Sequence, residues 1–105
     1  MSTTIIAPAT AMVPGAIGIV RLSGPRSLDI ARQITSIQDV TPRYAHFVNV
    51  GRDALVDKAI FIYFKAPRSF TGEDIVELHL HGNPHVMTDV IQLGVQCGAV
   101  MAEPG

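Results

Sequence analysis

The chain has 105 residues, enough for a single domain with one hydrophobic core. Apolar residues make up 48% of it and charged residues 16%, a balance that excludes an intrinsically disordered polypeptide. Eight basic and nine acidic residues give a net charge of −1, so there is no overall positive field for nucleic acid, and any RNA contact requires a local patch or another domain.

The N-terminal part predicts two strands and a helix. Residues 3–7 and 17–22 are β-prone, and a loop with Pro and Gly separates them. Gly18 removes one side chain from the second strand, which often lets another group approach the backbone closely. After a Gly-Pro turn, Ser27 offers a hydroxyl N-cap for a short helix that runs to about Thr35. Its buried stripe is expected to consist of Leu28, Ala31 and Ile34.

The middle of the chain predicts two further strands. Residues 43–50 have strand character, and residues 57–64 have more of it. In the second segment apolar side chains fall on both faces, which is typical of a central strand. Pro67 ends this strand.

The segment from Arg68 to Gly82 is a polar, glycine-containing loop that leads into a strand with two unlike faces. Because side chains alternate across a strand, the apolar residues share one face, namely Val76, Leu78 and Leu80. The polar residues share the other face, namely Glu77, His79 and His81. The first is an ordinary core face, whereas a carboxylate with two imidazoles on the second suggests a site.

A second helix and a last strand complete the chain. Asn83 is expected to cap the helix, and Pro84 at the first helical position loses no hydrogen bond that it needed. Apolar residues at helical spacing predict a buried stripe, made of Val86, Met87, Val90, Ile91, Gly94 and Cys97. Gly98 suits the position after the helix, and residues 99–102 predict a strand.

The predicted elements follow the order β, β, α, β, β, β, α, β. Two helices cannot cover both faces of so large a sheet. We therefore expect an α+β fold, with a mixed β-sheet of about five to six strands and helices mainly on one face. The other face is then open to a ligand or to a second subunit.

The chain lacks the common motifs of nucleotide chemistry. It has no Gly-x-x-x-x-Gly-Lys-Ser/Thr loop and no Gly-x-Gly-x-x-Gly, so these residues alone should not hydrolyse a nucleoside triphosphate, and we assign no catalytic residue. The single cysteine, Cys97, excludes an internal disulfide and suits a reducing compartment. No signal peptide and no apolar run of roughly 18 residues is evident, so we expect a cytoplasmic domain without a membrane partner.

The polar residues also have plainer interpretations. Arg21 at a strand end could pair with a carboxylate at the sheet rim, and Glu77 could be solvated on an open sheet face. His79 and His81 are more often exposed or satisfied histidines than ligands. With Glu77 they form an alternative metal site, but three residues on one strand face do not make a closed site, and we assign no metal.

Two segments together resemble one protein family. Residues 14–24, Pro-Gly-Ala-Ile-Gly-Ile-Val-Arg-Leu-Ser-Gly, resemble its N-terminal signature. Residues 69–74, Ser-Phe-Thr-Gly-Glu-Asp, with Glu77 and the His-Gly at 81–82, resemble its second signature. The family is that of the tRNA modification GTPase MnmE, also called TrmE, and the resemblance covers essentially all 105 residues. It implies that residues 1–105 form an N-terminal folate-binding and dimerisation domain, incomplete at its C-terminal end and similar to the tetrahydrofolate-binding domain of glycine-cleavage T-proteins.

The resemblance also implies a ligand and its contacts. The expected ligand is a one-carbon tetrahydrofolate, 5-formyltetrahydrofolate in relatives, and by motif Arg21 and Glu77 fall where the family contacts it. A carboxylate can accept two adjacent N–H groups of a pterin edge, and a guanidinium can donate to carboxylate and carbonyl oxygens. The other expected pocket residues are two glycines that would let a flat ring approach, Gly18 and Gly72, and two residues of the loop, Phe70 and Thr71.

Other domains and partners follow from the family alone. GTP, magnesium and potassium would belong to a G domain that these residues do not contain. The expected partners are a second copy of the chain, the flavoprotein MnmG, and tRNA, whose wobble uridine the full enzyme modifies. The alternative is an interaction module whose free sheet face makes a folate-independent dimer.

Overall fold

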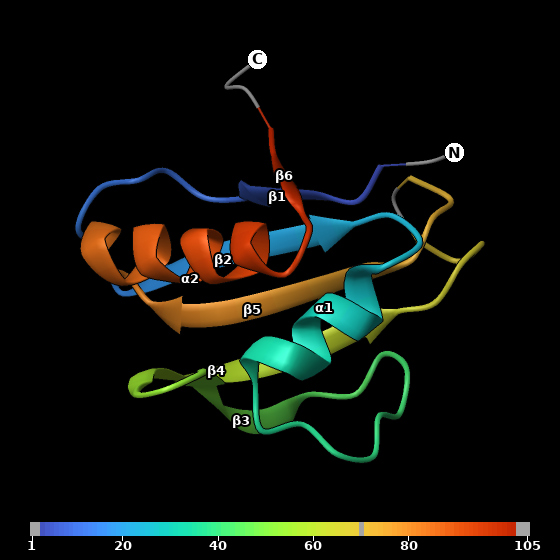
Figure 1. Ribbon diagram of the computed structural model, residues 1–105, viewed down its shortest axis with the longest axis horizontal. Coiled ribbons are helices and arrows are strands. Elements are labelled where there is room, and N and C mark those ends of the chain that lie inside the picture. Colours follow the sequence, from blue (N-terminus) through green and yellow to red (C-terminus); the bar gives the residue numbers. More distant parts are fainter. Residues whose placement is uncertain (1–2, 70, 103–105) are drawn as a thin grey trace.

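The computed structural model describes residues 3–69 and 71–102. Its strands are β1 (Ile5–Pro8), β2 (Ile17–Ser23), β3 (His46–Gly51), β4 (Leu55–Phe64), β5 (Ile75–His81) and β6 (Val100–Met101), and its helices are α1 (Ser27–Ile34) and α2 (Pro84–Gln96). In this part of the chain the strands form one sheet with the order β3-β4-β5-β2-β1-β6 (Figure 1). The predicted order of elements is confirmed.

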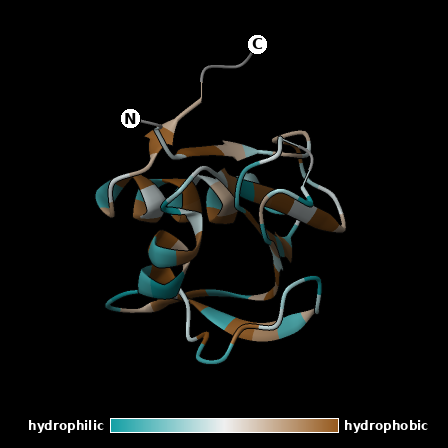
Figure 2. Ribbon diagram, turned by 90° about the vertical axis from the view of Figure 1, so that its right-hand side faces the viewer, coloured by the Kyte–Doolittle hydropathy of each residue, from teal (hydrophilic) through white to brown (hydrophobic). Residues whose placement is uncertain are grey.

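The sheet is mixed, and both helices lie on the same side of it. β6 runs parallel to β1, and the other neighbouring strands are antiparallel. In the side view the strands curve around the two helices, which turn hydrophilic residues outward (Figure 2). The predicted α+β fold, with helices on one face, is therefore confirmed.

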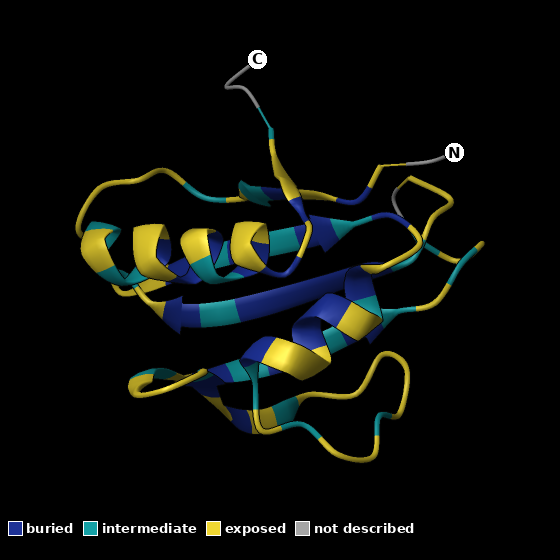
Figure 3. Ribbon diagram, viewed as in Figure 1, coloured by how far each residue is buried: buried dark blue, intermediate teal, exposed yellow. Residues whose placement is uncertain are grey.

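The hydrophobic core lies between the helices and the sheet. β5 is buried along nearly its whole length (Figure 3). Apolar side chains that alternate along the strands meet the inner faces of the helices, and the largest fully buried ones include Leu22, Phe61, Leu78, Ile30 and Met87. Within the described residues, no helix has the length and apolar character needed to span a membrane.

Helix α2 begins and ends as the sequence predicts. The Asn83 side chain accepts a hydrogen bond from the backbone N–H of His85 at 2.8 Å, and Pro84 is the first helical residue. Gly98 follows the helix with φ of 110°, a conformation that favours glycine. The buried stripe contains Met87, Val90, Ile91, Gly94 and Cys97, while Val86 is half-buried.

Helix α1 ends where the sequence predicts but begins differently. Ser27 is its first residue rather than its cap, and Arg26 occupies the cap position without a side-chain cap. The Ser27 hydroxyl instead donates to the carbonyl oxygens of Gly24 and Asp74 at 2.9 and 3.1 Å, because this side chain is fully buried. The helix ends at Ile34, and the buried positions are Ile30, Ala31 and Ile34, with Leu28 half-buried.

Strand β3 begins later than predicted because of Arg43. This residue has φ of 60°, in the left-handed region that interrupts an extended strand. Its N–H still donates to the Tyr63 carbonyl at 2.8 Å, which fixes the preceding turn against β4. Regular pairing starts only at His46, opposite Phe61.

Candidate functional site

The candidate site is centred on Arg21 and Glu77, which lie directly opposite each other on β2 and β5. Arg21 Nε and Nη2 donate to Glu77 Oε2 at 3.1 and 2.6 Å. Their neighbours Leu22 and Leu78 face the core, so this ion pair lies on the helix-free face. The expectation that Arg21 lies at a strand end is wrong, since this residue lies inside β2.

His79 joins the pair from the same strand. Its Nε2 lies 3.0 Å from Glu77 Oε1, and because an ionised carboxylate only accepts hydrogen bonds, this nitrogen carries the hydrogen. Both oxygens of Glu77 are thus engaged. The Glu77 side chain is 9% exposed, against 36% for Arg21.

The surroundings decide the protonation state of Glu77. Burial raises its pKa, but the hydrogen bonds from His79 and Arg21, with the charge of Arg21, outweigh burial and hold the pKa below its ordinary value of 4.5. The strand neighbours are apolar, since Ile62 lies opposite Glu77 and Ile19 lies opposite His79. Glu77 is therefore an ionised acceptor in a largely apolar sheet face.

His81 belongs to a different pair. Asp57 Oδ2 accepts the backbone N–H of His81 at 2.9 Å, and Asp57 Oδ1 lies 2.7 Å from its Nδ1. These bonds continue the contact of β4 with β5 beyond the last ladder pair, Ile60 and His79. Sequence reasoning missed Asp57, because no local signal reveals a partner 24 residues away.

The alternative metal site is not assembled. His81 bonds to Asp57 while His79 bonds to Glu77, so the three predicted side chains do not share a centre. In the described ranges 3–69 and 71–102, no group of three His, Cys, Asp or Glu side chains is placed to hold a metal ion.

Gly18 does not belong to the candidate site. It alternates with Arg21 along β2 and faces the helices, where a Cβ would collide with the side chain of Met87. A group does approach the backbone closely at Gly18, as expected. That group is the Met87 side chain of α2, on the opposite face of the sheet from Glu77.

The other predicted pocket residues lie in the loop before β5. Thr71 Oγ1 is 3.3 Å from Ser23 Oγ, and Ser23 shares its face with Arg21, so Thr71 lies at the end of the candidate site. Gly72 is exposed in the same loop with φ of 77°. Phe70 lies outside the described residues.

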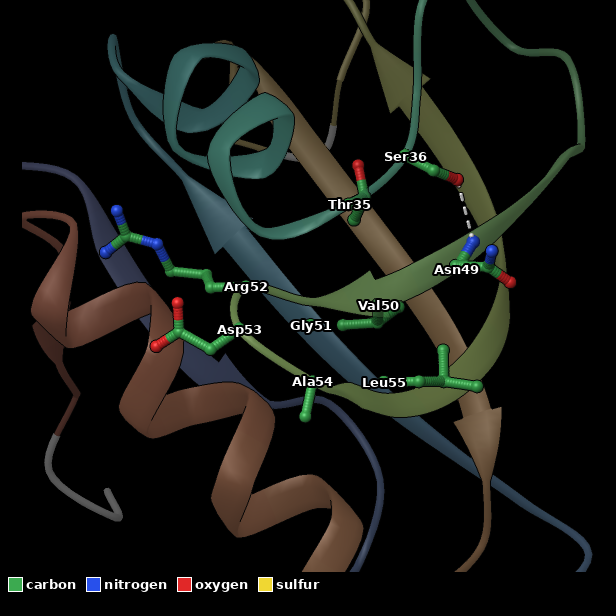
Figure 4. Close-up of a pocket in the computed structure, with 9 residues that line it drawn as sticks. All are labelled: Thr35, Ser36, Asn49, Val50, Gly51, Arg52, Asp53, Ala54 and Leu55. Carbon is green, nitrogen blue, oxygen red and sulfur yellow. Dashed lines mark hydrogen bonds between the residues drawn. The ribbon is translucent and has the colours of Figure 1, made fainter.

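Two further cavities are lined by residues other than Arg21 and Glu77. One of about 290 Å³ is lined by residues around the β3–β4 hairpin, namely Thr35, Ser36, Asn49, Val50, Gly51, Arg52, Asp53, Ala54 and Leu55 (Figure 4). Its Asn49 N–H donates to Ser36 Oγ at 2.9 Å, and no predicted site residue lines it. The other, of about 270 Å³, adjoins the network at His79 and is lined by Ala16, Ile17, Phe47, Lys58, Ala59, Ile60, His79, Leu80 and His81.

The chain matches one family over nearly all of its length. The family described as GTP-binding protein TrmE N-terminus matches residues 4–105. The chain is 45% identical to a tRNA modification GTPase MnmE from Helicobacter pylori (strain Shi470), over 100% of the chain and 24% of that relative. It is 48% identical to the MnmE of Francisella tularensis subsp. holarctica (strain LVS), over 97% of the chain and 23% of the relative.

A third relative, the MnmE of a Nitratiruptor species, is 47% identical over 99% of the chain and 24% of its own length. The chain thus spans about a quarter of the length of the curated relatives that it matches. Its ion pair lies within the two segments whose resemblance suggested the same family. The chain therefore belongs to the TrmE N-terminal family.

Proposed function

We propose that this chain is the folate-binding and dimerising part of a tRNA modification GTPase. The observation that carries the proposal is the Arg21–Glu77–His79 network on the helix-free face. An ionised carboxylate in an apolar setting is costly unless strong donors satisfy it, and its retention on an open sheet face suits a binding role.

The donor set fits a one-carbon tetrahydrofolate such as 5-formyltetrahydrofolate. The pterin edge presents N–H groups for Glu77, and the carbonyl and carboxylate oxygens suit Arg21. The isoleucines around Glu77 offer an apolar surface for a flat ring. When bound, the folate would supply the one-carbon unit for tRNA modification, while the residues of this chain bind and orient it.

The ion pair limits how Glu77 binds. Oε2 already accepts two N–H groups from Arg21, and Oε1 accepts one from His79. A carboxylate oxygen offers about two lone-pair positions, so two parallel bonds to a ligand require Arg21 to leave Oε2. Arg21 is the more exposed partner, so we expect it to turn toward the ligand while Glu77 stays fixed.

Isothermal titration with 5-formyltetrahydrofolate tests the folate proposal. The measurement uses this chain and, in parallel, the chain extended to the length of its relatives. We expect Glu77→Gln to weaken binding by about tenfold or more, because it removes a charged acceptor. Asp57→Asn makes the same chemical change, a carboxylate to an amide, in the Asp57–His81 pair and serves as the control. If neither wild-type protein binds the folate, the proposal is wrong.

The helix-free face also supports a homodimer. Its exposed apolar residues include Phe47 at 73% and Ile17 at 61%, and both line the same recess, as is typical of a surface that another subunit covers. Light scattering with and without folate tests the dimer. A dimer from a chain that binds no folate would support the alternative, an interaction module.

The activity of the longer relatives extends the proposal. Those relatives are named tRNA modification GTPases, so we propose that a G domain with GTP, magnesium and potassium acts with this part. We further propose MnmG and tRNA as partners, with the wobble uridine as target. The present sequence has no phosphate-binding loop, so this chain alone should show no GTP hydrolysis.

A further inference from the structure

We propose that three cations at one end of the helix-free face bind the glutamyl carboxylates of the folate tail. The cluster consists of Arg43, Lys65 and Arg68 and is called the tail cluster below. The inference rests on the folate proposal and extends it, because it states in which direction the ligand lies along the sheet and which form of folate binds best.

Two adjoining cavities bring the three cations together. One, of about 520 Å³, is lined by Arg43, Phe64, Arg68 and Ser69. The other, of about 290 Å³, is lined by Pro42, Arg43, Lys65, Ala66, Pro67 and Arg68. Arg43 and Arg68 line both, so the two cavities adjoin, and Lys65 lines the second. No carboxylate of the described residues lines either cavity.

Arg43 is held in place before any ligand arrives. Its Nη1 donates to the Arg68 carbonyl at 3.0 Å, and its Cζ lies 5.6 Å from the centre of the Phe64 ring. Its backbone adopts φ of 60°, which is uncommon for a residue with a side chain and often marks a functional position. A fixed guanidinium loses little freedom when it binds a carboxylate.

The positive charge of the tail cluster is not neutralised by the part of the chain that the structure describes. Its three side chains are exposed and form no ion pair there. Asp74 is the carboxylate that contacts the same loop, and its Oδ1 accepts the N–H of Ala66 at 2.9 Å. By contrast, Arg21 and Arg26 are each paired with a carboxylate.

Arg43 of the tail cluster lies over the ring of Phe64, which is on the same face as Glu77. Ile62 is directly opposite Glu77, and Phe64 lies two residues further along β4, a step of about 7 Å. When its pterin is held at Glu77, a folate can therefore place its benzoyl ring beside Phe64 and its glutamyl carboxylates at the tail cluster. The opposite end of the face offers Lys58, but there Asp57 adds a negative charge beside His81.

Glutamyl carboxylates suit this cluster better than RNA does. Guanidinium groups bind carboxylates in a fork geometry, and a chain of γ-linked glutamates presents several carboxylates in a row. RNA binding without sequence readout needs many phosphate contacts, whereas the tail cluster has three cations on a chain with net charge −1.

The test compares 5-formyltetrahydrofolate carrying one glutamate with the form carrying a γ-linked chain of glutamates. Titrations use the wild-type chain and the same chain extended to the length of its relatives. We expect the polyglutamate form to bind about tenfold tighter, since each exposed ion pair contributes up to about fivefold. The preference should shrink at about 1 M salt, where charges are screened beyond about 3 Å.

The variants locate the effect. Lys65→Gln combined with Arg68→Gln should abolish the polyglutamate preference, and Arg43→Gln should reduce it. The controls are Lys58→Gln at the opposite end of the face and Arg52→Gln in the β3–β4 turn, and both should keep the preference. A wild type that binds both forms equally, or a preference that only Lys58→Gln removes, overturns the inference and leaves the folate proposal intact. A preference unchanged in the tail-cluster variants, with weakened tRNA binding instead, also overturns it. Absence of any folate binding contradicts the folate proposal itself.

Discussion

Strand β5 carries two carboxylate–imidazole pairs, and they differ in what surrounds them. In the inner pair, Glu77 and His79 lie between neighbouring strands, and Glu77 also accepts hydrogen bonds from Arg21. In the outer pair, His81 is 75% exposed and meets Asp57 at the strand end. The two pairs have nearly the same bond lengths, 3.0 and 2.7 Å. Position in the sheet, rather than residue type, therefore makes the inner pair a candidate binding site and the outer pair a contact at the rim.

The largest expected effect is on stability. Glu77→Ala leaves Arg21 and His79 without their acceptor, and we expect it to lower the free energy of unfolding by about 2 kcal/mol, reduced from fully buried cases because Arg21 is partly exposed. Asp57→Ala should cost about 0.5–1 kcal/mol, because His81 can turn to water. Urea denaturation of both variants measures the difference. Equal losses would remove the distinction between the pairs.

The second effect is on acid stability. Burial raises the pKa of Asp57, but hydrogen bonds from His81 outweigh it, so its pKa, like that of Glu77, lies below the ordinary value. A lowered pKa gives stability that is fully present above the unfolded value and is lost as pH falls through the folded one. The contribution of Glu77 therefore begins to fall at about pH 4.5 and that of Asp57 at about pH 3.8, and each is fully lost only below the lowered pKa of the folded state.

Acid titrations of Glu77→Gln and Asp57→Asn separate the two contributions. We expect Glu77→Gln to flatten the loss of stability from pH 4.5 downward and Asp57→Asn to flatten only the part below pH 3.8. Thermal melts at a series of pH values give these slopes. An unchanged slope in Glu77→Gln would mean that the ion pair does not hold the charged form of this carboxylate.

The smallest effect concerns the two imidazoles. His79→Ala removes the donor to Glu77 Oε1 and lets the carboxylate rotate, so folate affinity should fall by about threefold to fivefold. His81→Ala should leave it unchanged, because this ring bonds to Asp57 instead. The same titration calorimetry measures both. A larger loss in His81→Ala would shift the site toward the strand end.

The sequence predicts local structure well and contacts between distant strands poorly. Alternation along β5 places Leu78 in the core and Glu77 on the other face, and Asn83 is correctly identified as a cap. The Arg21–Glu77 bond, however, depends on the register of strands whose paired residues are 56 positions apart. Local patterns carry no information on register, so the sequence leaves open which carboxylate pairs with Arg21.

The same limit explains the other errors. Ser27 is of a residue type that often caps helices, but it is buried, and its hydroxyl donates to the Asp74 carbonyl from the first turn of α1. Gly18 indicates close approach without indicating the face, and the approaching group is Met87. Residue type thus predicts that something unusual happens at a position, while tertiary packing decides which neighbour is involved.

The contact of Gly18 with Met87 shows that the two faces of β2 have different roles: one packs against α2, and the other carries Arg21. Helix α2 presses on one side of β2 at the residue where no side chain separates them, and three residues along the same strand Arg21 faces the other side. A larger residue at position 18 would have to displace the Met87 side chain, which is buried in the core. The close packing of α2 on β2 is thus tied to a residue of the strand whose other face carries Arg21.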